Sequence, residues 1–218
     1  LSRRKFITRS LMAGAGLALL PDRLLRAAEI APVGRKLKVA LIGIGNRGNQ
    51  LLKAFRDTGL VEFVAFCDVD LLGEHTAESR ELFPNVPGFQ DFRELFAKMG
   101  DRFEAVIIST PDHSHFAITM HAMAQGKHVY VEKPLAHTFQ EVELLMARAA
   151  RSGVVTQMGN QGHSGNNYHQ FKAWQEAGII ADVTRIDMFM NSPRRWHGWQ
   201  ADGFDSGYPV PATLDWDT

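Results

Sequence analysis

The stretch Leu37-Lys38-Val39-Ala40-Leu41-Ile42-Gly43-Ile44-Gly45-Asn46-Arg47-Gly48 decides the fold. Its first half is a nearly continuous apolar run, which is typical of a strand buried on both faces of a parallel sheet. Its second half is a G-x-G-x-x-G motif, and a helical pattern follows over residues 49–58. Strand, glycine-rich turn and helix in this order predict a phosphate-binding loop, because a helix N-terminus attracts anions.

Each glycine has its own expected role in such a loop. Gly43 permits the tight turn, Gly45 lets the backbone approach a pyrophosphate, and Gly48 lets the helix pack closely on the strand. We therefore expect the whole loop to bind a dinucleotide: Gly43, Ile44, Gly45, Asn46, Arg47 and Gly48. Arg47 could add a cationic contact, although a solvated arginine is an equal alternative. The alternative for the motif as a whole is a glycine-rich turn in another α/β fold.

An acidic residue follows the second expected strand, Val61 to Phe66. Asp68 stands twenty residues beyond Gly48, where a carboxylate accepts the adenosine ribose hydroxyls of a dinucleotide. The same carboxylate would repel the 2′-phosphate of NADP, and no arginine follows in residues 69–71. The sequence therefore favours NAD as cofactor, with NADP less favoured.

The alternation of strands and helices continues to about residue 160. Strands are expected over 105–109, 128–131 and 154–158, and helices over 72–83, 91–99, 110–124 and 139–151. Thr110-Pro111 is expected to cap and open the third of these helices. The pattern predicts an α/β fold, a Rossmann-type doubly wound parallel sheet, over residues 35–160. A change of texture near residue 160 predicts a second domain over 161–218, with a helix over 168–177 and a strand from Val183 to Met190.

Composition excludes several functional classes. The chain has 218 residues, and its 24 lysines and arginines balance 24 aspartates and glutamates. No net field favours nucleic acid as a partner. The one cysteine, Cys67, excludes an internal disulfide framework and is expected to be a buried, inert thiol. The spacing of His163, His169 and His197 fits no recognised metal site.

Residues 1–30 are interpreted as an export signal. Arg3 and Arg4 precede a short apolar stretch from Leu11 to Leu20, which is a signal-peptide layout and too short for a stable membrane span. The pair followed by Phe6 resembles the twin-arginine signal, which predicts export to the periplasm. A disordered basic tail or an uncleaved anchor is the alternative. Because that route carries folded proteins, an exported protein of this kind is expected to load its cofactor first and hold it tightly.

Two later motifs carry a family resemblance. Residues 110–115 read Thr-Pro-Asp-His-Ser-His after an expected strand, and residues 126–134 read Gly-Lys-His-Val-Tyr-Val-Glu-Lys-Pro after the next helix. Together with the phosphate loop they resemble the Gfo/Idh/MocA family, which includes glucose–fructose oxidoreductase and inositol dehydrogenases. The stretch over 157–165 resembles the exported branch of that family.

The resemblance implies roles for particular residues. Residues expected to line or approach the cofactor are Ser109, Thr110, Pro111, His115, Glu132, Lys133 and Gln161. Glu132 and Lys133 would lie close to the nicotinamide, and Lys133 would be the catalytic residue that contacts the reacting hydroxyl and helps relay its proton. The bond between Lys133 and Pro134 can be cis in this family. A capping or packing histidine is the alternative for His115, and an exposed strand-end lysine is the alternative for Lys133.

The chain departs from the family in its second half. Full-length members supply an aspartate and a histidine in a D-x-x-x-H helix, and Asp182, Asp187 and Asp202 have no histidine four positions on. The chain is therefore expected to be a piece that begins an α+β domain with a mainly antiparallel sheet, binds cofactor and lacks most catalytic activity. The full-length protein is expected to form a homo-oligomer. Residues that could line a substrate site, or simply pack a loop, are Tyr168, Arg194, Arg195, Trp196, His197 and Trp199.

The resemblance predicts an NAD-dependent oxidoreductase acting on a sugar, polyol or glycoside. A hydride would pass between the hydroxyl-bearing carbon and the nicotinamide, and the Lys133 ammonium would stabilise the developing alkoxide. One alternative is an NAD-dependent glycoside hydrolase that oxidises, eliminates and re-reduces its substrate; retention of Lys133 favours the dehydrogenase. Another alternative is a domain that binds NAD without turnover.

Overall fold

The computed structural model describes residues 34–188 and 209–215 of the chain. The chain divides into two units, Leu1–Lys36 and Leu37–Thr218, and every element below belongs to the second. The expected export signal lies outside the described residues. So do Arg194, Arg195, Trp196, His197 and Trp199, the loop residues considered for a substrate site.

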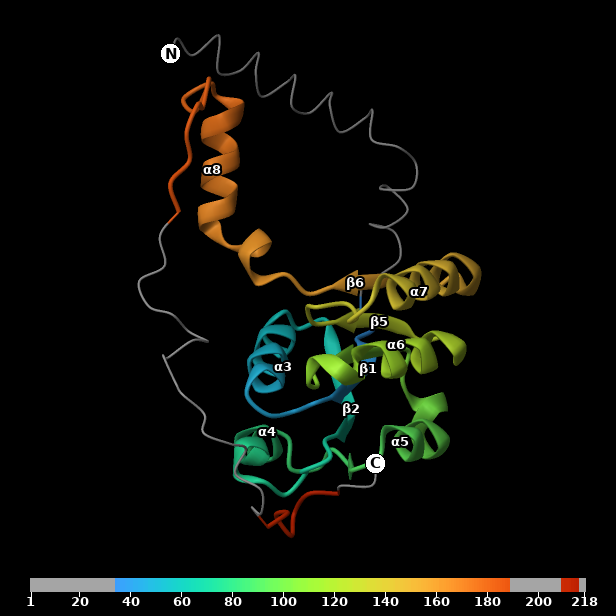
Figure 1. Ribbon diagram of the computed structural model, residues 1–218. Helices are drawn as coiled ribbons and strands as arrows, with labels where there is room; N and C mark the ends of the chain where they lie inside the picture. Colours follow the sequence, from blue (N-terminus) through green and yellow to red (C-terminus); the bar gives the residue numbers. More distant parts are fainter. Residues whose placement is uncertain (1–33, 189–208, 216–218) are drawn as a thin grey trace, which may run out of the picture. The chain divides into compact units, whose positions relative to one another are not determined.

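A six-stranded sheet carries the fold (Figure 1). Its strands are β1 (Leu37–Ile42), β2 (Val61–Cys67), β3 (Gly88–Phe89), β4 (Ala105–Ile108), β5 (His128–Val131) and β6 (Thr156–Met158). Their order is β3-β2-β1-β4-β5-β6, and each neighbouring pair is parallel. This order is that of the doubly wound Rossmann sheet, so the predicted fold class is confirmed.

Helices follow the strands in the expected alternation. They are α3 (Arg47–Asp57), α4 (Ala77–Leu82), α5 (Phe92–Met99), α6 (His115–Ala124), α7 (Phe139–Ser152) and α8 (Asn166–Glu176). Short 3₁₀ turns are η1 (Glu74–Thr76), η2 (Gly100–Arg102), η3 (Asp112–Ser114) and η4 (Gln161–Ser164). Local chemistry fixes both ends of α7: Thr138 and Glu141 form a capping box at its start, and Gly153, at φ 67°, ends it in the left-handed conformation.

The core has one cluster on each face of the sheet, and β1 contributes to both. Ala40 and Ile42 belong to the cluster that includes residues of α5, α6 and α7, whereas Val39 and Leu41 belong to the cluster that includes residues of α3. Successive side chains of a strand point to opposite faces, so a strand covered on both faces must be apolar at every position. The unbroken apolar run in the sequence has this cause.

The structure differs from the sequence expectation at three places. The helix expected from Thr110 begins at His115, because Pro111 is extended (φ −57°, ψ 147°) and η3 follows it. The edge strand β3 has only two residues and was not expected. The strand expected from Val183 to Met190 is wrong over residues 183–188, which carry no regular structure. A strand needs a partner for its backbone groups, and residues 183–188 pair with none of the six strands.

Candidate functional site

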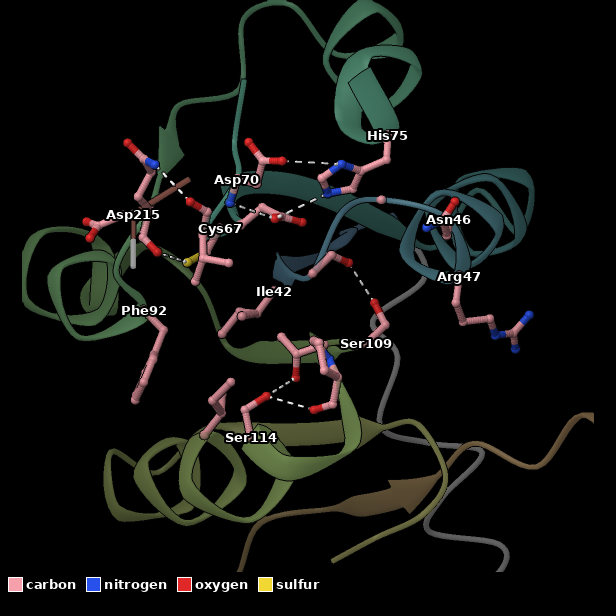
Figure 2. A pocket seen from close by; sticks show the side chains of 18 of the residues that line it. Ile42, Asn46, Arg47, Cys67, Asp70, His75, Phe92, Ser109, Ser114 and Asp215 are labelled. Carbon is pink, nitrogen blue, oxygen red and sulfur yellow. Dashed lines mark hydrogen bonds and ion pairs between the residues drawn. The ribbon is translucent and has the colours of Figure 1, made fainter. Parts of the chain in front are cut away.

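A cavity of about 730 Å³ opens where β1, β2 and β4 end (Figure 2). The strand order reverses between β1 and β4, and ligands of open α/β sheets bind outside the carboxyl ends of strands at such a point. The lining residues are Ile42, Gly43, Gly45, Asn46, Arg47, Cys67, Asp68, Val69, Asp70, His75, Gln90, Phe92, Ser109, Thr110, Pro111, His113, Ser114, Ile118, Leu214 and Asp215. Its size is that of a small-molecule or cofactor site.

The glycines at the two ends of the phosphate loop are required by close backbone contacts. Gly43 has φ 81°, and a Cβ there would lie 2.7 Å from the backbone of Ser109. A Cβ on Gly48 would lie 1.8 Å from the carbonyl oxygen of Gly43. The Ser109 hydroxyl donates to that same oxygen at 2.7 Å. The loop is therefore folded tightly against the start of α3 and the end of β4.

The middle glycine makes room for a histidine that the sequence analysis missed. A Cβ on Gly45 would lie 2.1 Å from Cδ2 of His75. The His75 ring lines the cavity, with Nε2 3.7 Å from Asp68 Oδ1 and Nδ1 3.7 Å from Asp70 Oδ2. Figure 2 shows the ring facing the Asp70 carboxylate. No spacing rule in the sequence links residue 75 to the loop.

Asp68 lies at the end of β2 and joins that strand to the phosphate loop. Its Oδ2 accepts a hydrogen bond from the backbone N–H of Ile44 at 2.9 Å, and its Oδ1 accepts from the N–H of Asp70 at 3.1 Å. Each carboxylate oxygen has two lone pairs, so both retain capacity to accept from a ribose hydroxyl. Ile44 thus contributes through its backbone; its side chain is in the core.

The end of β4 supplies the opposite wall of the cavity. Ser109, Thr110 and Pro111 all line it. The Ser114 hydroxyl donates to Thr110 Oγ1 at 2.7 Å, which ties the turn to the 3₁₀ segment before α6. The sequence expectation placed these three residues at the cofactor, and the structure brings them to the same cavity as the glycine loop and Asp68.

A second cluster consists of Arg47, which lines the cavity, and of Glu132 and Gln161, which do not. Glu132 follows β5, is 4% exposed, and accepts from Arg47 Nε at 3.0 Å and Nη2 at 2.8 Å through Oε1. Its Oε2 accepts from Gln161 Nε2 at 3.0 Å. Arg47 lines the edge of the cavity, but Figure 2 shows its side chain directed away from the other lining groups. The sequence did not indicate this three-residue cluster.

Lys133 and His115 flank the same turn. Lys133 is exposed and the Lys133–Pro134 peptide is cis. His115 is 1% exposed; its Nδ1 lies 2.6 Å from the carbonyl oxygen of Pro134 and its Nε2 2.9 Å from that of Thr110. His115 thus links the turn after β5 to the end of β4. The residues expected at the cofactor but absent from the cavity lining are Ile44, Gly48, His115, Glu132, Lys133 and Gln161.

A distant segment also reaches the cavity. The N–H of Asp215 donates to the carbonyl oxygen of Val69 at 2.8 Å, and Gln90 Nε2 donates to the carbonyl oxygens of Val69 at 2.8 Å and Thr213 at 3.1 Å. Leu214 and Asp215 line the cavity beside Phe92 and Gln90. Sequence reasoning missed these residues, because their place depends on a contact between segments more than 100 positions apart.

Two titratable groups near the site are shifted by their surroundings. Burial raises the pKa of the Cys67 thiol, and neighbouring Asp68 raises it further. The thiol is therefore protonated and inert at neutral pH, as the sequence indicated. Burial also raises the pKa of Tyr130, and the Glu132 carboxylate adds to the rise. Within residues 34–188 and 209–215, no three His, Cys, Asp or Glu side chains are grouped to hold a metal.

The matched family and solved structures agree with this geometry. Residues 37–160, more than half of the chain, match the Gfo/Idh/MocA family, described as an oxidoreductase family with an NAD-binding Rossmann fold. A dehydrogenase from Chromobacterium violaceum superposes with a TM-score of 0.59 at 28% identity, over 65% of this chain and 40% of that one. An oxidoreductase from Agrobacterium radiobacter, solved with NAD⁺, L-tartaric acid and magnesium, gives 0.61 at 25% identity, over 67% and 42%.

Curated relatives match a little more than half of the chain. An alpha-N-acetylgalactosaminidase of Shewanella oneidensis is 35% identical over 130 residues, which are 56% of this chain and 28% of that protein. The uncharacterized oxidoreductase YfiI of Bacillus subtilis is 33% identical over 131 residues, 60% of this chain and 31% of that protein. The chain thus spans less than a third of the length of these relatives.

The residues present fit a nicotinamide dinucleotide. The glycine loop offers the close backbone approach that a pyrophosphate needs, and α3 opens at that loop with its N-terminal N–H groups. Asp68 lines the cavity, where its carboxylate could accept hydrogen bonds from ribose hydroxyls. The cavity continues past the loop to the end of β4.

In the part of the chain that is described, no helix has the length and apolar character needed to cross a bilayer.

Proposed function

The chain belongs to the Gfo/Idh/MocA oxidoreductase family, with its NAD-binding Rossmann fold, and from that premise we propose that the protein transfers a hydride between NAD and a sugar, polyol or glycoside hydroxyl. One observation supports this most: the glycine loop, Asp68 and the end of β4 line a single cavity at the switch point of the sheet. The Asp68 carboxylate faces that cavity and favours NAD over NADP, because a 2′-phosphate beside it would be repelled.

Lys133 is the residue proposed to act on the substrate. It is exposed and follows Glu132 at the carboxyl end of β5. This strand lies in one half of the sheet, and β2, which precedes Asp68, lies in the other half. In a doubly wound fold the half that contains β5 takes the second mononucleotide. When bound, the nicotinamide accepts or gives the hydride; Lys133 would hold the substrate oxygen and stabilise the charge that develops on it.

Export, the second domain and assembly are proposed from the sequence motifs and the family resemblance. Residues 1–30 would direct the folded, cofactor-loaded protein through the twin-arginine route to the periplasm. Residues 161–218 would begin the substrate and oligomerisation domain, whose remainder would supply the aspartate and histidine of the full active site. The complete protein would act as a homo-oligomer.

The relatives support a second candidate function. Several of them are named as glycosyl hydrolase family 109 proteins, and one is named an alpha-N-acetylgalactosaminidase. Such a protein would use NAD without net reduction, cleaving a glycoside by oxidation, elimination and re-reduction. Lys133 favours the dehydrogenase, because the NAD-dependent hydrolases that resemble this family usually carry a different residue at that position of the Glu-Lys-Pro motif.

One assay of the full-length protein separates the candidates. Sugars, polyols and nitrophenyl glycosides are added with NAD⁺, and absorbance at 340 nm is followed together with release of nitrophenol. A dehydrogenase reduces NAD⁺ with at least one polyol or sugar, and Lys133→Met abolishes the reduction while NADH still binds. Nitrophenol release without net reduction would assign the hydrolase, and binding without either reaction would contradict both enzymes.

A further inference from the structure

Three chain segments meet at the buried Glu132 carboxylate. Arg47 opens α3 after β1, Glu132 follows β5, and Gln161 opens η4 after β6. Two nitrogens of the Arg47 guanidinium donate to Oε1 at 3.0 and 2.8 Å, and the Gln161 amide donates to Oε2 at 3.0 Å. We call this set the Arg47–Glu132–Gln161 bridge. Because β4 lies between β1 and β5 in the sheet, the bridge joins segments that follow two strands which are not neighbours.

The bridge is a built feature and not a loose surface contact. The Glu132 side chain is 5% exposed, and a buried carboxylate persists only where charge and hydrogen bonds compensate its lost hydration. The backbone at this point is also fixed, since Glu132 N–H donates to Ile108 at 2.9 Å. Gly159 keeps the space open: a Cβ there would lie 2.7 Å from Glu132 Oε1.

All three guanidinium nitrogens of Arg47 donate hydrogen bonds to other side chains of the protein. A third guanidinium nitrogen, Nη1, donates to Gln50 Oε1 at 3.0 Å. The guanidinium group therefore lies away from the other residues that line the cavity (Figure 2). An arginine beside a phosphate loop is ordinarily expected to bind the phosphates, but the geometry here gives it a different partner.

The location of the bridge decides what it would affect. Asp68 after β2 marks the adenosine half of the site, so the ends of β4, β5 and β6 belong to the nicotinamide half. Lys133 comes directly after Glu132. We propose that Arg47 is a positioning residue: acting through Glu132, it fixes the Glu132–Lys133 turn of the nicotinamide half to the phosphate loop and does not bind the pyrophosphate. This inference rests on the proposed dinucleotide site.

Two ligands separate this role from a direct phosphate contact. ADP-ribose contains the adenosine and the pyrophosphate but no nicotinamide, whereas NADH contains all three. Their dissociation constants are measured on the full chain by calorimetry, for wild type, Arg47→Met, Glu132→Gln and the double variant. Arg56→Met is the matched control, because Arg56 lies in the last turn of the same helix, is paired with Asp57 and does not line the cavity.

The proposal predicts a selective and non-additive loss. Arg47→Met weakens NADH binding about tenfold, about the size of one lost charge-assisted hydrogen bond, and leaves ADP-ribose within about threefold. Glu132→Gln shifts the ratio of the two dissociation constants in the same direction. The double variant binds NADH no more weakly than the more weakly binding single variant, since each single substitution already removes the same Arg47–Glu132 interaction. Arg47→Lys, which keeps the charge but not the two-nitrogen fork, recovers only part of the loss.

Other results would overturn the proposal. An equal loss of ADP-ribose and NADH in Arg47→Met would mean that Arg47 binds the pyrophosphate. Losses that multiply in the double variant would mean that Arg47 and Glu132 act independently. If Arg47→Met does not fold, as judged by circular dichroism, Glu132→Gln and Arg47→Lys carry the same comparison. Failure of the wild-type chain to bind either ligand would contradict the proposed cofactor site itself, and that result is seen before any variant is compared.

Discussion

Gly48, the last glycine of the phosphate loop, packs so closely on the backbone that any side chain would clash. A Cβ on Gly48 would lie 1.8 Å from the carbonyl oxygen of Gly43, and both atoms are backbone. We expect Gly48→Ala to lower the free energy of unfolding by about 2 kcal/mol, because the loop must shift away from the helix. Urea denaturation measures the loss. Gly100→Ala is the control, since nothing lies within 4 Å of that Cβ; equal stabilities of the two variants would contradict the packing argument.

The charge of Asp68 is expected to decide the choice of cofactor. Asp68→Asn keeps an oxygen for the Ile44 N–H, which donates to the carboxylate at 2.9 Å, but removes the charge that would face a 2′-phosphate. The ratio of the NADP to the NAD dissociation constant should fall about tenfold or more. Fluorescence titration with NADH and NADPH measures it. Asp57→Asn, at the end of α3, should leave the ratio unchanged; an unchanged ratio in Asp68→Asn would show that another group discriminates.

Single residues were predictable where the relevant partners follow each other in the chain. The sequence singled out Gly43 and Gly48 because one strand–turn–helix unit contains them both, and Asp68 because its distance from the loop is a property of one crossover; their binding of a dinucleotide stays a prediction. His75 was missed, although a Cβ on Gly45 would touch its ring. Its place depends on how η1 packs over the loop, and no local pattern in the sequence encodes that packing.

Among the elements, α7 depends most clearly on a local signal. The Thr138 hydroxyl accepts from the Glu141 N–H at 3.2 Å, and the Glu141 carboxylate accepts from the Thr138 N–H at 3.0 Å. Thr138→Ala removes half of this capping box and should lower the free energy of unfolding by about 1 kcal/mol. Glu143→Ala, on the same helix and outside the box, is the comparison in urea denaturation. A loss no larger than that of Glu143→Ala would show that packing alone sets the start of the helix.

Element prediction succeeded where burial and periodicity agree. The strands β1 and β4 are buried on both faces and were found as apolar runs. The start of α6 was misplaced, because the sequence rule for proline at a helix start does not reveal that Pro111 is extended here. The strand expected at 183–190 was wrong over its described part, since an apolar alternation predicts a strand only where a neighbour is present to pair with it.

For the whole molecule, the cavity depends on segments that only the fold brings together. The loop after β1, Asp68 after β2 and the turn after β4 were all predicted as separate motifs, and the parallel sheet places their ends at one edge. The contribution of Leu214 and Asp215 could not be predicted. It depends on the bonds of Gln90 and Val69 to residues 213–215, and the sequence carries no signal for a contact at that separation.

Binding of a nicotinamide dinucleotide can be measured on the purified protein. The folded chain is purified and denatured, and the supernatant is assayed for NAD(H) and NADP(H); a second sample is titrated with NAD⁺ and NADP⁺ by calorimetry. We expect about one NAD(H) per chain, either released from the protein or bound on titration, with a clear preference over NADP(H). A folded chain that releases and binds neither dinucleotide, or that prefers NADP(H), would contradict this expectation.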